Sequence, residues 1–167
     1  MKTKKQLFIL TAILFAGIIA TSCIHKGQPS QVGELITIEQ LKSLPSDDSW
    51  NLKSVAVDAY LSYCGRLIKF DQRNTAVITT EPSCKSDRLI EAKIAIKDAE
   101  SKSVLLGGKE PNNYISMPKS NLGIENSEFV LDDYQKVGYR EKLRISGTLI
   151  YDNGKYYMND VTLHTIQ

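Results

Sequence analysis

The chain has 167 residues, with 21 basic and 19 acidic side chains and a formal net charge of +2 at pH 7. This length suits a single domain with its own hydrophobic core. The nearly balanced charge excludes a global polycation that would bind nucleic acid through its net charge alone.

The N-terminus has the pattern of a secretion signal. Three lysines lie within the first five residues, and an apolar run follows from Leu7 to Ala20. Small residues at positions 21 and 22 then precede Cys23, which is the order of a bacterial signal and its cleavage site. A helix of about 14 residues is roughly 21 Å long, which is shorter than the bilayer core of about 30 Å. The alternative is a short anchor helix that is never cleaved.

The segment Ala20-Thr21-Ser22-Cys23 resembles the lipobox of bacterial lipoproteins, although Ala stands where Leu is commoner. The resemblance implies that residues 1–22 are a signal peptide and that acyl chains on Cys23 hold the protein to a membrane. Two or more acyl chains give lasting attachment. Ile24 follows the cysteine, and the absence of Asp there implies the outer membrane, facing the periplasm. The alternative is ordinary cleavage, which gives a free periplasmic protein.

Residues 23–35 are largely polar, with glycine and proline, and are predicted to be a lipidated flexible tether.

Export also bears on the remaining cysteines. Of the three cysteines, Cys64 and Cys84 remain after Cys23. Because an exported compartment is oxidising, we predict that these two form a disulfide. Closing a loop of about 20 residues stabilises the fold by about 3 kcal/mol in the chain-entropy model. Catalytic or metal-binding thiols are the alternative, although no CxxC pair is present.

The folded domain is expected to span residues 36–167 and to begin with a short helix. Thr37 and Gln40 have the spacing of a capping box, and Pro45 ends the helix. Removal of the signal leaves 18 basic and 19 acidic groups, so the domain itself has almost no net charge.

Three strands are predicted next, at residues 51–64, 76–80 and 89–97, from the alternation of apolar and polar side chains. The third strand has one polar face. Its Glu, Ala and Lys residues also suit a helix, but the strict period of two favours a strand.

A loop and a second helix are predicted after these strands. Residues 99–126 contain several Gly and Pro residues and are predicted to be irregular. The segment Glu128 to Val137 is predicted to be a helix, with a cap at Asn126-Ser127 and with Gly138 at its C-terminal end.

The C-terminal segment has the clearest pattern. Asn153-Gly154 lies between two alternating segments and predicts a hairpin with a two-residue turn. In that register, polar residues would follow Met158 on the core face. We therefore predict a β-bulge near Asn159-Asp160, which returns Val161 and Leu163 to the core.

The order of the predicted elements resembles the OB-fold, a five-stranded Greek-key barrel with a helix between strands three and four. The segments "VAVDAYLSY" and "ISGTLIYDNGKYYMNDVTL" resemble the first strand and the last hairpin of OB-like domains in bacterial lipoproteins. The expected fold class is therefore mostly β, an OB-like barrel with that helix and a short N-terminal helix. A small β-sandwich or another barrel is the alternative.

Residues typical of catalysis are scarce. The two histidines, His25 and His164, are too few to build a tetrahedral metal site once both thiols are paired. A Ser-His-Asp triad would require His164, and no GxSxG motif is present. Residues 116–119 spell SxxK, but in a segment rich in breakers. We therefore predict a protein that is not an enzyme and binds no metal or cofactor. A hydrolase with an unrecognised site is the alternative.

Binding is the remaining class of function. OB-folds bind ligands on strands two and three and the adjacent loops. Residues 64–97 are rich in Lys and Arg, so this face is predicted to bind an envelope protein or glycan. A nucleic acid fits the cell envelope poorly. Alternatively, this segment or the acidic segment 98–134 docks a structural lipoprotein onto an envelope complex. The predicted contact residues are Tyr60, Arg66, Lys69, Arg73, Lys93, Lys97 and Tyr139.

Overall fold

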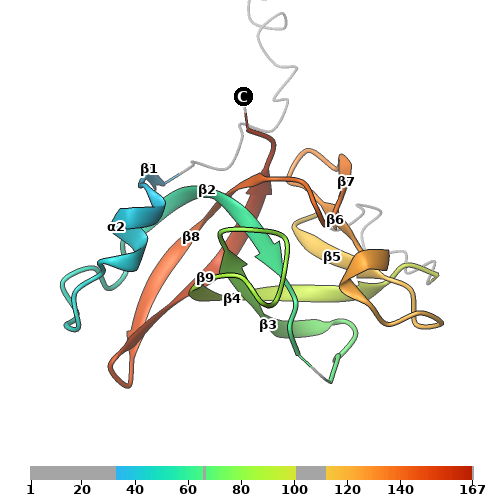
Figure 1. Cartoon of the computed structure of the whole chain (residues 1–167), viewed down its shortest axis with the longest axis horizontal. Helices are drawn as coiled ribbons and strands as arrows, with labels where there is room; N and C mark the ends of the chain where they lie inside the picture. Colours follow the sequence, from blue (N-terminus) through green and yellow to red (C-terminus); the bar gives the residue numbers. More distant parts are fainter. Residues whose placement is uncertain (1–32, 66, 101–111, 167) are drawn as a thin grey trace, which may run out of the picture.

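The computed structural model describes residues 33–65, 67–100 and 112–166 (Figure 1). The predicted signal peptide, Cys23 and all but the last three residues of the predicted tether lie outside this range, as does Arg66. In the described part of the chain, no helix has both the length and the apolar character needed to cross a membrane.

Five strands close into a barrel (Figure 1). Each neighbouring pair around the barrel is antiparallel except β4 and β9, which run parallel. The three strands predicted in the first half of the domain and the C-terminal hairpin are thus confirmed. In the order of pairing, the strands are β2 (Ser54–Ser62), β3 (Gln72–Thr79), β4 (Arg88–Asp98), β9 (Lys155–His164) and β8 (Leu143–Asp152), which pairs with β2 again.

The period of two in the sequence accounts for the core of the barrel. In β4, Ile94 and Ile96 are at most 2% exposed, whereas Lys93 and Lys97 lie on the other face and reach solvent. The same alternation in β2 places its apolar residues in the barrel interior. These residues are Val55, Val57, Ala59 and Leu61, all fully buried.

The predicted hairpin and its bulge are both confirmed. The ladder between β8 and β9 pairs Tyr151 with Tyr156, as the Asn-Gly turn requires. Its register then shifts between Ser146 and Thr148, so that β9 has one residue more than β8 at this point. Asp160 adopts a φ of 50° there. As a result, Val161 and Leu163 return to the core, with exposures of 8% and 0%.

A short helix, α2 (Ile38–Lys42), covers one end of the barrel. Its predicted capping box is present: the Gln40 N–H donates to Thr37 Oγ1 over 3.1 Å, and the Thr37 N–H donates to Gln40 Oε1 over 2.8 Å. Leu41 is buried in the core cluster. Just before α2, the two-residue strand β1 (Glu34–Leu35) pairs parallel to β2.

The predicted helix over residues 128–137 is wrong, because these residues form a hairpin. Strand β6 (Glu128–Val130) pairs antiparallel with β7 (Lys136–Gly138) and with β5 (Tyr114–Met117). The consecutive residues Phe129, Val130 and Leu131 are all buried. A single helical stripe cannot bury three consecutive side chains, whereas a strand covered on both faces can.

The predicted loop 99–126 also needs a correction, since β5 lies within it. The single-turn 3₁₀ helix η2 (Ile124–Asn126) follows β5. The described residues thus form a mostly β fold, with a closed five-stranded barrel, a three-stranded extension β5–β6–β7 and a single α-helix of five residues.

Candidate binding face

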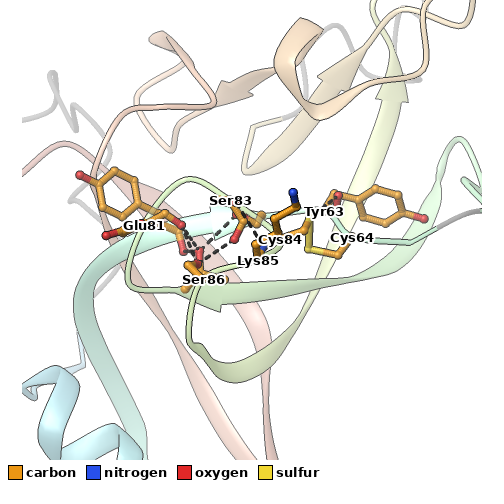
Figure 2. The surroundings of a disulfide bond; sticks show 10 residues. Tyr63, Cys64, Glu81, Ser83, Cys84, Lys85 and Ser86 are labelled. Atoms are coloured by element: carbon orange, nitrogen blue, oxygen red, sulfur yellow. Dashed lines mark hydrogen bonds between the residues drawn. A yellow bond between two sulfur atoms is a disulfide. The ribbon is translucent and has the colours of Figure 1, made fainter.

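The disulfide predicted from the cysteine count is present. Cys64 follows β2, Cys84 lies in the connection between β3 and β4, and their Cα atoms are 5.6 Å apart. Figure 2 shows the turn around Cys84, in which Ser86 Oγ donates to the carbonyl oxygens of Glu81 and Ser83 over 3.1 and 2.7 Å. The disulfide therefore fastens the end of β2 to a turn that has its own hydrogen bonds.

The loop between β2 and β3 is fixed by buried polar groups. The amide of Asn74, 7% exposed, accepts from the Lys69 N–H over 3.0 Å and donates to the Lys69 and Gln72 carbonyl oxygens. The Tyr63 hydroxyl donates to the Leu67 carbonyl oxygen, and burial raises the pKa of this phenol. Beside this loop lies a hollow of about 410 Å³. It is lined by Tyr63, Gly65, Leu67, Lys69, Arg73, Asn74 and Thr75.

Two lysines on the outer face of β4 lie over tyrosine rings. Lys93 Nζ donates to Thr75 Oγ1 over 2.7 Å and lies 5.7 Å from the ring centroid of Tyr157 on β9. Lys97 Nζ lies 5.3 Å from the ring centroid of Tyr114 on β5. A ring face attracts an ammonium group without neutralising its charge. Within the described ranges, neither lysine forms an ion pair with a carboxylate.

Arg73 lies on the same outer face. It pairs with Ala95 in the ladder of β3 and β4. Its guanidinium nevertheless reaches β9, where it donates to Asn159 Oδ1 over 2.8 Å and to Asp160 Oδ1 over 3.0 Å. We call Arg73, Lys93 and Lys97 the cationic strip. Thr75 connects the strip to the hollow, because it lines the hollow and accepts from Lys93.

The structure brings together four of the seven predicted contact residues, namely Lys69 and the three members of the cationic strip. Tyr60 lies on β2 opposite Thr79 and does not line the hollow. Tyr139 lies beyond β7 and accepts a hydrogen bond from Arg140 Nε over 2.8 Å. These two residues are therefore separate from the strip.

Three residues of this face were not predicted: Thr75, Tyr114 and Tyr157. Tyr157 was within reach of sequence reasoning, since alternation in β9 places it on the face opposite Tyr156. Tyr114 was not, because its position beside Lys97 depends on the pairing of β5 with β4.

A Ser-His-Asp arrangement lies elsewhere, on the outer face of β8 and β9. Ser146 Oγ is 3.0 Å from His164 Nε2, and His164 Nδ1 is 3.0 Å from Asp132 Oδ2. Hydrolytic triads have the same order of groups. However, Ser146 and His164 are only 5% and 8% exposed, and Ser146 is paired on both sides, with Ala56 and Thr162. We interpret the three residues as a structural clasp.

The other catalytic and metal-binding patterns can be placed as well. Ser116 of the SxxK sequence is on β5, and Lys119 beyond it pairs with Asp98 over 3.2 Å, so the motif is not helical. Across the described residues, no group of three or more His, Cys, Asp or Glu side chains could hold a metal ion.

No protein-family model matches the chain, and no curated protein sequence matches it significantly. Function is therefore inferred from the geometry of this chain's own residues.

Proposed function

We propose that this protein is an exported, membrane-anchored lipoprotein whose OB-like barrel binds an envelope glycan or protein and performs no catalysis. The pairing of the barrel strands supports the OB-like assignment. The first barrel strand, β2, pairs with both the second and the fourth, β3 and β8, as closure of a five-stranded barrel of this type requires. The second and third strands, β3 and β4, then carry the cationic strip, and OB-folds bind ligands on these two strands.

The disulfide supports the proposed location. Disulfides persist in oxidising compartments and are rare in the cytosol, so Cys64–Cys84 fits a domain that folds after export. The lipobox resemblance at Cys23 supplies the anchor, which would be the acyl chains. In this proposal the tether ends close to the barrel, since β1 already pairs with β2.

The observation that carries the proposal is that Lys93 and Lys97 have no carboxylate partner among the described residues, on a face that continues into a hollow. Lys69 adds a further cation at that hollow. An extended anionic ligand would provide the missing negative charges. A row of positive charges suits an acidic glycan chain better than it suits a protein partner. Protein interfaces have an apolar centre, which this row lacks. The large exposed apolar residues are instead spread over the molecule: Leu35, Leu52, Leu67, Leu122, Tyr134 and Ile166.

Retention on matched glycans tests the proposal. The full-length lipoprotein in neutral-lipid nanodiscs is passed over immobilised dextran sulfate and over dextran of the same length. We expect retention on the sulfated form, a strong decrease with added salt, and loss of retention in a Lys93→Glu/Lys97→Glu variant. A Lys136→Glu/Lys142→Glu variant is the matched control, since these lysines lie outside the strip.

Other results of this test would favour a different function. Unchanged retention in the Lys93→Glu/Lys97→Glu variant would favour a structural or assembly lipoprotein, in which this face docks onto an envelope complex. Crosslinking in the native membrane would then identify the partner. Tighter binding of single-stranded DNA than of dextran sulfate at equal salt would favour a nucleic-acid ligand instead.

A further inference from the structure

A second cavity lies where the barrel strands β4 and β9 separate. Their ladder consists of two pairs, Glu91 with Tyr157 and Ala92 with Met158. Residues at the hairpin end of both strands line the space, and α2 and the residues after it contribute further lining, from Leu41 to Ser46. The space between is a groove of about 720 Å³, which we call the seam groove. Small-molecule sites have volumes of about 300–1,000 Å³.

Apolar side chains form the base of the seam groove. Leu41 and Ile90 are buried there, and Leu44 and Leu89 are partly buried and pack against the core. Tyr156 from β9 completes this lining. Leu44, Leu89 and Tyr156 keep exposed surface from which a ligand can displace water, which favours binding of an apolar body.

Hydrogen bonds hold the walls of the groove together before any ligand binds. The Tyr151 hydroxyl donates to the Ser46 carbonyl oxygen over 2.6 Å, and the Tyr156 hydroxyl donates to the Asp47 carbonyl oxygen. The Trp50 N–H donates back to the Tyr156 hydroxyl over 2.9 Å. The turn after α2 is thus fixed to the hairpin, and a preformed site reduces the entropy lost on binding.

Basic side chains dominate the rim. Arg88, Lys93 and Lys155 line the groove, as does Lys42, whose ammonium is already paired with Asp87 over 2.9 Å. Two carboxylates, Glu91 and Asp152, also line it. In the described part of the chain, Arg88 and Lys155 have no ion-pair partner. The rim therefore complements a ligand with a negatively charged head.

We infer that the seam groove binds a small amphiphile, with an apolar body on the leucine base and one anionic headgroup between Arg88 and Lys155. A fatty carboxylate and a lipid phosphate share this chemistry. The site goes beyond the glycan-binding function proposed above, because Arg88, Lys155 and the leucines lie outside the cationic strip and the loop hollow. The groove and the strip share Lys93, which neither variant below changes.

Photolabelling of the full-length lipoprotein in neutral-lipid nanodiscs tests the inference. The probes are three diazirine-bearing ten-carbon chains that differ only in the head: a carboxylate, a phosphate and an uncharged alcohol. We expect saturable labelling by a charged probe in peptides that contain residue 77 or residues 41–46, 88–93 or 152–157, and weak labelling by the alcohol. Preference for the carboxylate assigns a fatty acid, and preference for the phosphate assigns a lipid headgroup.

Two variants complete the test. An Arg88→Gln/Lys155→Gln variant removes two exposed charges without touching the core, and we expect labelling by the charged probe to fall roughly fivefold. An Arg140→Gln/Lys142→Gln variant is the matched control and should label normally. Equal labelling by the alcohol, labelling outside these peptides, or an unchanged Arg88→Gln/Lys155→Gln variant would each overturn the inference. Because the cationic strip is intact in both variants, dextran sulfate retention reports separately on the glycan-binding proposal.

Discussion

His164 Nδ1 lies 3.0 Å from Asp132 Oδ2 and joins the end of β9 to the turn between β6 and β7. Two further hydrogen bonds reinforce this link: the Asp132 N–H donates to the Leu163 carbonyl oxygen over 3.0 Å, and the Leu163 N–H donates to the side-chain oxygen Oδ1 of Asn113 over 2.8 Å. The extension formed by β5, β6 and β7 is thereby fastened to the barrel. The β6–β7 hairpin is too short to be stable by itself, so this fastening matters for the fold.

Removal of the imidazole should loosen the extension. We expect His164→Ala to lower the free energy of unfolding by about 1–3 kcal/mol, because Ser146 and Asp132 each lose a partner in a poorly solvated place. Chemical denaturation at pH 7 measures the change. Asp132→Asn is the milder variant, since its amide oxygen can still accept from Nδ1. Equal stability of His164→Ala and the wild type would contradict the clasp.

The same three residues allow a test for catalysis. If Ser146, His164 and Asp132 are structural, a fluorophosphonate probe should leave Ser146 unmodified in the folded protein, because this residue is only 5% exposed. Mass spectrometry of the labelled protein gives the answer. Stoichiometric modification of Ser146 that disappears in His164→Ala would instead indicate an activated nucleophile and would favour the hydrolase alternative.

Acid should weaken the ion pair between Arg144 and Asp58 on the barrel wall. Arg144 donates from Nε and Nη2 to the two carboxylate oxygens of Asp58, over 2.8 and 3.0 Å. These hydrogen bonds hold the pKa of Asp58 below its usual value, against the opposing effect of burial. Because the folded pKa is the lower one, the stabilisation is complete above the unfolded pKa of about 4 and is lost as pH falls through the folded value.

Stability measured against pH can isolate this contribution. We expect Asp58→Asn to cost about 1–2 kcal/mol at pH 7, because the variant loses charge-assisted hydrogen bonds. The difference between wild type and variant should shrink as the pH is lowered below 4. Urea denaturation from pH 7 to pH 2.5 follows it. A difference that stays constant over this range would show that Asp58 does not titrate with a depressed pKa.

Local patterns in the sequence determined the barrel strands and the C-terminal hairpin. The bulge at Asp160 was predictable because Val161 and Leu163 would otherwise face solvent. The β6–β7 hairpin was not, because Glu128 and Lys136 suit the ends of a helix as well as paired strands. The pairing of β6 with β5 decides between a helix and a strand here. That pairing joins residues that are not neighbours in the sequence.

The candidate site, like the fold, could be predicted from the sequence only in part. Alternation within β4 was enough to place Lys93 and Lys97 on the outer face. It could not show that Arg73 crosses to β9, since its partners there, Asn159 and Asp160, lie at the bulge. The seam groove was also beyond sequence reasoning, because it is formed by four separate segments.

The bulge itself can be tested at Gly147, the β8 residue that faces it. A Cβ atom on Gly147 would lie 2.6 Å from the Asn159 carbonyl oxygen and 2.6 Å from Met158 Cγ. The carbonyl belongs to the β9 backbone and cannot move without disturbing the ladder. We therefore expect Gly147→Ala to cost about 1–3 kcal/mol of the free energy of unfolding, as overpacking does in other cores.

Gly138 on β7 provides the matched control for this substitution. A Cβ atom there meets nothing within 4 Å, so Gly138→Ala should be neutral or slightly stabilising through the reduced entropy of the unfolded chain. Denaturation of both variants under the same conditions makes the comparison. Equal stability of the two variants would mean that β9 does not approach Gly147 this closely. Arg73 would then lose the bulge that places Asn159 and Asp160 beside its guanidinium.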